Sequence, residues 1–219
     1  GVVNEGVVAL KLGLPGIPSI AEDIMVARDI YLAKYTGGRV HFAHVSTEGA
    51  VSLIREAKAQ GIKVTAEVTP HHLIFTEEDV LANPYDTNYK VNPPLRTERD
   101  RVALIEALKD GTIDVIATDH APHASFEKEL QFIDAPFGII GLETALSVLV
   151  DKLVNTGELD WMTFIAKLTV NPAKILGLDK GWLKEGEPAE LVVFDPEAEW
   201  VFDSPRSLSR NSPFLGKRL

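Results

Sequence analysis

Two polar side chains stand at the ends of segments that have the apolar, β-branched character of strands. His44 lies near the end of the segment Arg39–Val45, and Asp119 directly follows the segment Ile113–Thr118. In an extended chain every second side chain points the same way, so each of the two shares a face with the residues two and four positions before it. A neutral imidazole and a carboxylate are both suitable zinc ligands, and the carboxylate could instead act as a general base. We therefore predict that His44 and Asp119 converge on one metal-binding and catalytic centre.

Both residues also have a plainer interpretation. A histidine at a strand end is more often a hydrogen-bonded structural residue than a metal ligand. A carboxylate inside a barrel is costly unless it is paired or bound to a metal, so burial alone leaves a functional and a structural role for Asp119 both open.

Three further segments carry candidate residues. The amide of Asn92 could orient a polar ligand, although an Asn-Pro pair is also a common start of a turn. The adjacent His71 and His72 face opposite ways in an extended chain, so at most one could reach a common centre, and both could instead hydrogen-bond neighbouring loops. The segment Phe137-Gly138 has no ionisable group, but its glycine lets a ligand approach the backbone closely; the alternative is a turn before the next helix.

The segments that carry these residues alternate between helix and strand. Ser19 with Glu22 predicts a capping box at the start of a helix that Gly37-Gly38 ends. The other expected helices span residues 47–60, a short stretch from 76, 97–108, 142–155 and 161–176, the last interrupted at Asn171-Pro172, and the strands span 39–45, 63–68 and 113–118. This order predicts an α/β fold of parallel βαβ units, in which functional groups gather at the carboxyl ends of the strands.

The character of the chain changes after Gly177. Turn residues follow, and the segments Ala189–Phe194 and Trp200–Phe202 are typical of a β-hairpin or of two strands in a small sheet. We therefore expect two units, a barrel-like part over residues 1–178 and a small β element over residues 179–219.

Composition excludes several classes of partner and ligand. The net charge is −10 with no cluster of lysine or arginine, which argues against nucleic-acid binding. There is no cysteine, so metal ligands must be histidine or carboxylate. No apolar run reaches membrane-spanning length and no leader-like segment begins the chain, so we expect a cytoplasmic protein without membrane contact. The sequence starts at Gly1 without methionine, which suggests a processed chain or a piece of a longer one.

Five motifs in order resemble the second half of the bacterial class I dihydroorotases, a family of the amidohydrolase superfamily. They are HVST at 44–47, EVTPHHL at 67–73, VNPPLR at 91–96, ATDHAPH at 117–123 and FGIIGLE at 137–143. Two later segments, NPAKILG at 171–177 and AELVVFD at 189–195, are similar to the C-terminal signature of that superfamily.

The resemblance implies a part of a TIM (β/α)8 barrel, about strands six to eight with their helices, and part of a small β-sandwich. It implies His44 as a metal ligand on the sixth strand, Asp119 as a metal ligand and catalytic acid/base on the eighth, and substrate contacts from Asn92, His123, Phe137 and Gly138. The implied activity is reversible, zinc-dependent hydrolysis of the cyclic amide of dihydroorotate to N-carbamoyl-aspartate in pyrimidine biosynthesis, with one or two zinc ions in the complete enzyme. Homo-oligomerisation and association with aspartate transcarbamoylase are the implied protein contacts.

The chain departs from the family in what it lacks. The family's His-x-His-Leu-Arg strand, its bridging aspartate or carboxylated lysine and its His-Cys-Glu-Asp strand are absent, and two ligands are fewer than a catalytic zinc needs. We expect a fragment that is inactive alone and needs a partner to cover its exposed strands.

Two other functions stay open. One is a related cyclic amidase, a dihydropyrimidinase or allantoinase, although these usually carry a Cys-Pro-aromatic segment where this chain has Thr69-Pro70-His71-His72. The other is a non-catalytic dihydroorotase-like scaffold for aspartate transcarbamoylase. Such scaffolds typically lose metal ligands, whereas His44 and Asp119 are present.

Overall fold

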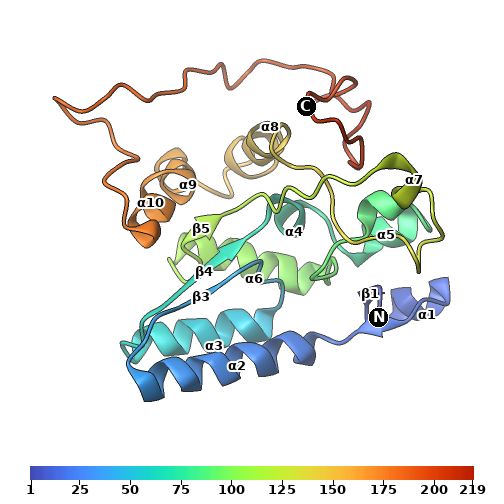
Figure 1. Cartoon of the computed structure of the whole chain (residues 1–219), viewed down its shortest axis with the longest axis horizontal. Coiled ribbons are helices and arrows are strands. Elements are labelled where there is room, and N and C mark those ends of the chain that lie inside the picture. The colour runs from blue at the N-terminus through green and yellow to red at the C-terminus, as the bar shows by residue number, and fades with distance from the viewer.

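Three short parallel strands form the sheet of the computed structural model, which describes all 219 residues (Figure 1). They are β3 (Val40–Phe42), β4 (Val64–Val68) and β5 (Val115–Ile116), and they lie side by side in that order. The register pairs Val40 with Val64 and Glu67 with Val115. The three predicted strands are confirmed, although β3 and β5 are shorter than expected. A second, two-stranded parallel sheet joins β1 (Val3–Asn4) to β2 (Gly16–Ile17) and was not predicted.

Helices occupy most of the remaining chain up to residue 176. They are α1 (Val7–Leu12), α2 (Ser19–Thr36), α3 (Glu48–Ala59), α4 (Pro70–Ile74), α5 (Glu77–Ala82), the 3₁₀ helix η1 (Thr87–Tyr89), α6 (Glu98–Lys109), α7 (Ser125–Lys128), α8 (Ala145–Leu149), the π-helix η2 (Val150–Val154), α9 (Trp161–Leu168) and α10 (Val170–Leu176). None of these helices combines the length and the apolar character that crossing a membrane requires.

Local sequence signals explain where several helices begin. Thr47 caps α3, and the pairs Thr76/Asp79 and Thr97/Asp100 form capping boxes at α5 and α6. The capping box predicted at Ser19 is wrong, because Ser19 is already helical and Pro18 precedes it without a side-chain cap. Glu22 accepts instead from the backbone N–H groups of Ser46 and Thr47, so a long-range contact took the place of the local one.

Two predicted helix boundaries are corrected as well. The helix expected from Leu142 begins only at Ala145 and continues as the π-helix η2. The break expected at Asn171-Pro172 falls earlier, at Thr169, whose φ and ψ of −128° and −87° are not helical. Pro172 then lies in the first turn of α10, where a missing backbone N–H costs no hydrogen bond.

The two faces of the sheet differ in character. Phe42, Ala66 and Val68 are buried on the face that α2, α3 and α6 cover, and they belong to one hydrophobic cluster with side chains of those helices. Figure 1 shows α2 and α3 side by side along this face. The opposite face carries polar side chains, His41 and Glu67 among them, because successive residues of a strand point to opposite sides. The architecture is α/β and is consistent with part of a (β/α)8 barrel.

A buried arginine joins segments that are far apart in the sequence. Arg96 is 4% exposed and donates through Nη1 to Asn4 Oδ1 at 2.9 Å and to the carbonyl of Ile17 at 2.7 Å. Its Nε donates to Ser46 Oγ at 3.1 Å, and its Nη2 lies 3.7 Å from Glu22 Oε2. This one guanidinium therefore connects the β1–β2 sheet, helix α2 and the loop after β3.

A second polar cluster lies at the start of β5. Asp114 Oδ2 accepts from Lys58 Nζ at 2.7 Å and from the N–H of Ala66 at 2.9 Å. Lys167 Nζ donates to the carbonyl of Ile113 at 2.6 Å, and Asn171 Nδ2 donates to that of Asp114 at 2.9 Å. These bonds attach α3, α9 and α10 to the amino-terminal end of β5.

The tail after α10 does not form the predicted hairpin. Residues 189–194 are in no strand, and Val192 and Val193 are 81% and 91% exposed. Trp200 and Phe202 pair instead with the backbone of residues 217–219, around a single antiparallel bridge between Val201 and Arg218. A run of apolar, β-branched residues favours an extended chain, but a strand forms only where another backbone is available to pair with it. No β-sandwich is present, and the tail appears in Figure 1 as a long loop.

Replacing Arg96 with methionine tests the joining role of this arginine. The variant leaves Glu22, Asn4 and Ser46 without their cation, so we expect a loss of about 3–5 kcal/mol in the free energy of unfolding, measured by urea denaturation of this chain. Arg99→Met is the matched control, because Arg99 is 80% exposed beside Glu48 and should cost less than about 1 kcal/mol. Equal losses in the two variants would contradict the assignment.

Phe202→Ala tests whether the tail is part of the same cooperative unit. Phe202 is fully buried in the main hydrophobic cluster, so we expect its truncation to cost about 3–5 kcal/mol in the main unfolding transition. Leu208→Ala, at a fully exposed position, is the control and should change little. A main transition that is unaltered in Phe202→Ala would support two independent units divided near residue 178, a division that stays a prediction.

Candidate functional site

His44 and Asp119 lie beside each other where β3 and β5 end. The distance from His44 Nε2 to Asp119 Oδ1 is 3.5 Å, which is long for a hydrogen bond. Two atoms that each bind a tetrahedral zinc ion at about 2.1 Å lie about 3.4 Å from each other. The spacing of this nitrogen and this oxygen therefore fits an ion held between them.

Both residues have a backbone conformation that residues other than glycine rarely adopt. Their φ angles are 55° for His44 and 48° for Asp119, in the left-handed region where histidine and aspartate are found more often than most residues. The chain on either side is fixed by ladder bonds from Val45 N to the Glu67 carbonyl and from Ala117 N to the Val68 carbonyl. Such strain persists where surrounding structure imposes it, and it is concentrated at functional sites.

The left-handed backbone changes the face of the sheet to which the His44 side chain points. Alternation predicted that His44 shares a face with Phe42, which is buried on the helix-covered side. His44 instead contacts Glu67, which lies on the polar face with His41. The residue was identified by its place at the strand end, whereas its orientation follows from φ.

Glu67 connects two histidines, and the sequence analysis did not single it out. Its Oε1 lies 2.8 Å from His44 Nδ1, a close contact without the alignment of a hydrogen bond, and its Oε2 is hydrogen-bonded to His41 Nε2 at 3.0 Å. Thr65 Oγ1 is bonded to His41 Nδ1 at 2.8 Å. A signal was present in the sequence: Thr65 and Glu67 alternate with apolar residues in β4, so they occupy the other face of that strand.

The electrostatics of this group follow from the contacts. Burial raises the pKa of Glu67, but its contacts with His41 and His44 outweigh burial and lower that pKa to about 2. The contact with Glu67 raises the pKa of His44, burial opposes this, and Asp119 adds to the increase. The surroundings thus stabilise the protonated, positively charged form of His44.

The chain offers an incomplete set of metal ligands. His44 and Asp119 are chemically suited to zinc or a similar divalent ion. No group of three histidine or carboxylate side chains in the structure is placed to enclose an ion. A catalytic zinc commonly has three protein ligands, so further ligands would have to come from outside this chain.

The two adjacent histidines lie in the short helix α4 and not in an extended segment. His72 is bonded through Nδ1 to Thr69 Oγ1 at 2.7 Å and through Nε2 to the carbonyl of Pro93 at 2.9 Å. Complete burial lowers the pKa of His72 to about 4. His71 is also buried, its Nε2 has no hydrogen-bond partner, and burial holds its pKa well below the usual range. Bonding to a neighbouring loop, the plainer alternative, is what His72 shows.

His123, Phe137 and Gly138 form a second group. His123 Nε2 is hydrogen-bonded to the carbonyl of Phe137 at 2.8 Å. Gly138 has a φ of 120°, and a Cβ there would lie 2.6 Å from Ala121 Cβ, so only glycine fits. The bridge between His120 and Ile139 holds this segment against the loop that follows Asp119.

Two buried lysines support the segment that contains Phe137. Lys90 Nζ donates to the carbonyls of Phe132 at 2.7 Å, Ile133 at 3.1 Å and Ala135 at 2.5 Å. Lys128 Nζ donates to the carbonyls of Pro136 and Gly138 at 2.9 and 3.1 Å. Burial, with repulsion from Lys90, lowers the pKa of Lys128 to about 8.

Two asparagines lie next to this segment. Asn211 Nδ2, from the tail, donates to the carbonyls of Ala121 and Gly138 at 2.9 and 3.1 Å. Asn92 is exposed and its amide has no partner within the chain, while Gly138 N donates to the nearby Lys90 carbonyl at 2.9 Å. The backbone of Lys90, two residues before Asn92, thus lies against Gly138, and His123 contacts Phe137. The supporting lysines and Asn211 had no signal in the sequence that distinguished them from surface residues.

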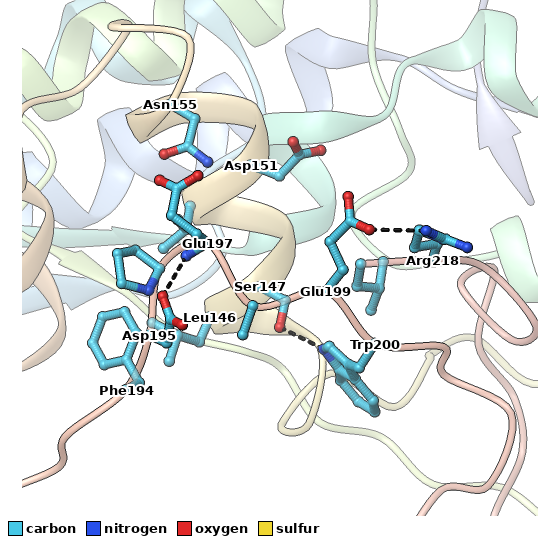
Figure 2. Close-up of a pocket in the computed structure, with 14 residues that line it drawn as sticks. Leu146, Ser147, Asp151, Asn155, Phe194, Asp195, Glu197, Glu199, Trp200 and Arg218 are labelled. Atoms are coloured by element: carbon cyan, nitrogen blue, oxygen red, sulfur yellow. Dashed lines mark hydrogen bonds and ion pairs between the residues drawn. The ribbon is translucent and has the colours of Figure 1, made fainter.

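A separate cavity of about 450 Å³ lies between the α8–η2 helix and the tail (Figure 2). Carboxylates of Asp151, Asp195 and Glu197 line it, and Glu199 pairs with Arg218 at 2.9 Å. None of the predicted site residues lines this cavity, so it is distinct from the candidate site.

Sequence comparisons give a consistent family. The model of the amidohydrolase family matches residues 12–210. The chain is 54% identical over 221 residues to a dihydroorotase of Pelotomaculum thermopropionicum, covering 100% of this chain and 51% of that protein. It is 54% identical over 218 residues to a dihydroorotase of Geobacter metallireducens, covering 99% of this chain and 51% of the relative. The chain thus spans about half the length of the curated relatives it matches.

Solved structures agree with this family. An L-hydantoinase (dihydropyrimidinase) from Arthrobacter aurescens superposes with a TM-score of 0.85 at 32% identity, over 92% of this chain and 46% of that one. A dihydropyrimidinase from Brevibacillus agri gives a TM-score of 0.81 at 28% identity, over 92% and 46% of the two chains. From its sequence and its fold, the chain belongs to the amidohydrolase family.

Proposed function

We propose that this chain forms half of a dihydroorotase active site. The observation that carries the proposal is the convergence of His44 Nε2 and Asp119 Oδ1 to 3.5 Å, in a chain that is 54% identical to dihydroorotases along its whole length. In this proposal β3, β4 and β5 are the sixth to eighth strands of a (β/α)8 barrel. The exposed tail segment 189–194 belongs to a small β-sandwich whose other strands lie outside this chain.

The chemistry assigned to the pair is hydrolysis of a cyclic amide. A zinc ion at His44 and Asp119 would polarise the amide carbonyl and make an attacking water more acidic. Asp119 accepts the proton of the water as it attacks the amide carbon and returns it to the departing ring nitrogen. The same steps in reverse close the ring of N-carbamoyl-aspartate.

The second group of residues binds the substrate in this proposal. His123 and Asn92 hold polar groups of dihydroorotate, and the backbone of Phe137-Gly138 contacts its ring. The exposed amide of Asn92 without an internal partner supports this role, as does the close approach that Gly138 permits. Homo-oligomerisation, association with aspartate transcarbamoylase and a cytoplasmic location stay predictions.

A second candidate function is hydrolysis of a different cyclic amide. It is favoured by the similarity of fold to the hydantoinase and dihydropyrimidinase structures, at 28–32% identity. The higher identity to dihydroorotases and the Thr69-Pro70-His71-His72 segment favour dihydroorotate.

A chimera allows the catalytic assignment to be tested. In this chimera the chain replaces the matching 51% of the Pelotomaculum dihydroorotase, which supplies the remaining half. We expect the zinc-loaded chimera to hydrolyse dihydroorotate, and Asp119→Asn to lower kcat by at least about 10³-fold with an unchanged circular dichroism spectrum, because it loses both a ligand and the general base. Asp151→Asn, on the exposed surface, is the control and should retain activity. Wild-type rates in Asp119→Asn would refute the role.

The choice of substrate is tested with the same chimera. We expect kcat/KM for dihydroorotate to exceed that for dihydrouracil by more than about 10³-fold, because a site built to pair with the extra carboxylate leaves polar groups unpaired when it is absent. A preference for dihydrouracil or hydantoin would favour the second candidate. Tight binding to aspartate transcarbamoylase without hydrolysis of any of these would favour a scaffold.

A further inference from the structure

We propose that Glu67 is a positioning residue that sets the orientation and the protonated nitrogen of His44, and that His41 and Thr65 hold Glu67 in place. The proposal rests on the proposed function, in which His44 and Asp119 bind the metal. It assigns a role to a row of polar side chains on the polar face of the sheet.

The first step concerns the two nitrogens of His44. Nδ1 lies 2.8 Å from Glu67 Oε1, and Nε2 lies 3.5 Å from Asp119 Oδ1. An ionised carboxylate can only accept, so the nitrogen that faces Glu67 most closely carries the proton. The lone pair of a neutral His44 is then on Nε2, directed toward the position it shares with Asp119.

The second step concerns Asp119. A lone pair that faces a carboxylate oxygen at 3.5 Å is repelled unless a cation lies between them. Metal-binding histidines usually direct their other ring nitrogen to a carboxylate or carbonyl, which fixes the ring and makes it a better ligand. Glu67 stands at that position.

The third step concerns the residues that hold Glu67, which are His41 and Thr65. Glu67 Oε2 is an acceptor only, so His41 Nε2 donates to it at 3.0 Å. His41 Nδ1 then accepts from the hydroxyl of Thr65 at 2.8 Å. Donors therefore point in one direction from Thr65 to Glu67 Oε2, and the other oxygen, Oε1, lies 2.8 Å from His44 Nδ1. Its side chain is 15% exposed, which leaves little room for another orientation.

The competing explanation is an ion-pair network without a metal. A doubly protonated His44 could contact Glu67 and Asp119 at once and serve stability alone. The two explanations differ in one observable property, because only the positioning role makes metal affinity depend on Glu67.

The test is zinc binding by the chimera, measured by competition with a chromogenic chelator in the absence of substrate. Glu67→Gln keeps the size of the side chain but presents an amide that can donate to Nδ1, which favours a proton on Nε2 where the metal should bind. We expect affinity for zinc to fall about 10–100-fold. Glu67→Asp keeps the charge and should recover part of the loss, and Thr65→Val should weaken binding only a few-fold. Glu56→Gln, at an exposed position on α3, is the matched control with no expected change.

A spectroscopic measurement keeps the test independent of affinity. In the metal-free chimera labelled with ¹⁵N-histidine, the His44 signal, assigned by its loss in His44→Asn, should show the proton on Nδ1 at neutral pH. In Glu67→Gln the signal should shift toward the Nε2–H form. Unchanged zinc affinity in Glu67→Gln, or a loss of the same size in Glu56→Gln, would overturn the proposal, as would a doubly protonated His44 that persists when zinc is added.

The outcomes separate this inference from the proposed activity. A chimera whose zinc affinity depends on Glu67 but which hydrolyses no dihydroorotate would refute the activity and retain the positioning role. A chimera that hydrolyses dihydroorotate, with zinc affinity indifferent to Glu67, would refute the positioning role alone.

Discussion

The buried guanidinium of Arg96 is the interaction on which the arrangement of this chain depends. A cation that is 4% exposed is tolerated only when its donors are satisfied, and here the partners come from Asn4, Ile17 and Ser46. These partners precede Arg96 by up to 92 positions in the sequence. Ser46 follows His44 by two residues, so the same contact that closes the fold also holds the chain immediately after the candidate ligand. Stability and the geometry of the site are therefore coupled through one side chain.

The segment that contains Arg96 supports both halves of the candidate site. Lys90, at its other end, donates hydrogen bonds to three carbonyls of the segment that leads to Phe137. Arg96 donates to Ser46 in the segment after β3. Asn92 lies between them and is exposed. Two buried cations thus anchor the ends of a rigid, proline-containing segment and leave the amide between them free to contact a ligand. This division between anchored ends and an exposed centre is a common way to position a binding group.

The polar face of the sheet places a carboxylate between two histidines. Glu67 lies between His41 and His44, and the low pKa of its carboxyl follows from those two contacts. A carboxylate held in this way supplies negative charge behind a metal-binding imidazole. The left-handed backbone at His44 and Asp119 brings the two side chains together, which regular strands would not do. The polar face of the sheet and the exposed tail segment 189–194 are consistent with a chain that spans about half the length of its relatives.

The sequence by itself determined the order of the three central strands and of the main helices between them, the helix starts near residues 47, 76 and 97, and the two strand ends that carry His44 and Asp119. These features depend on neighbouring residues, since a cap or a strand pattern is complete within a few positions. Only the tertiary structure decided that Glu22 bonds to Ser46 and Thr47 instead of forming a box with Ser19, that residues 189–194 remain unpaired, and that Glu67 contacts His44. It also decided the orientation of His44, because a φ of 55° overrides the alternation of an ideal strand. Each of these outcomes depends on a partner that is distant in the sequence, or on strain that such partners impose, and no local pattern encodes it.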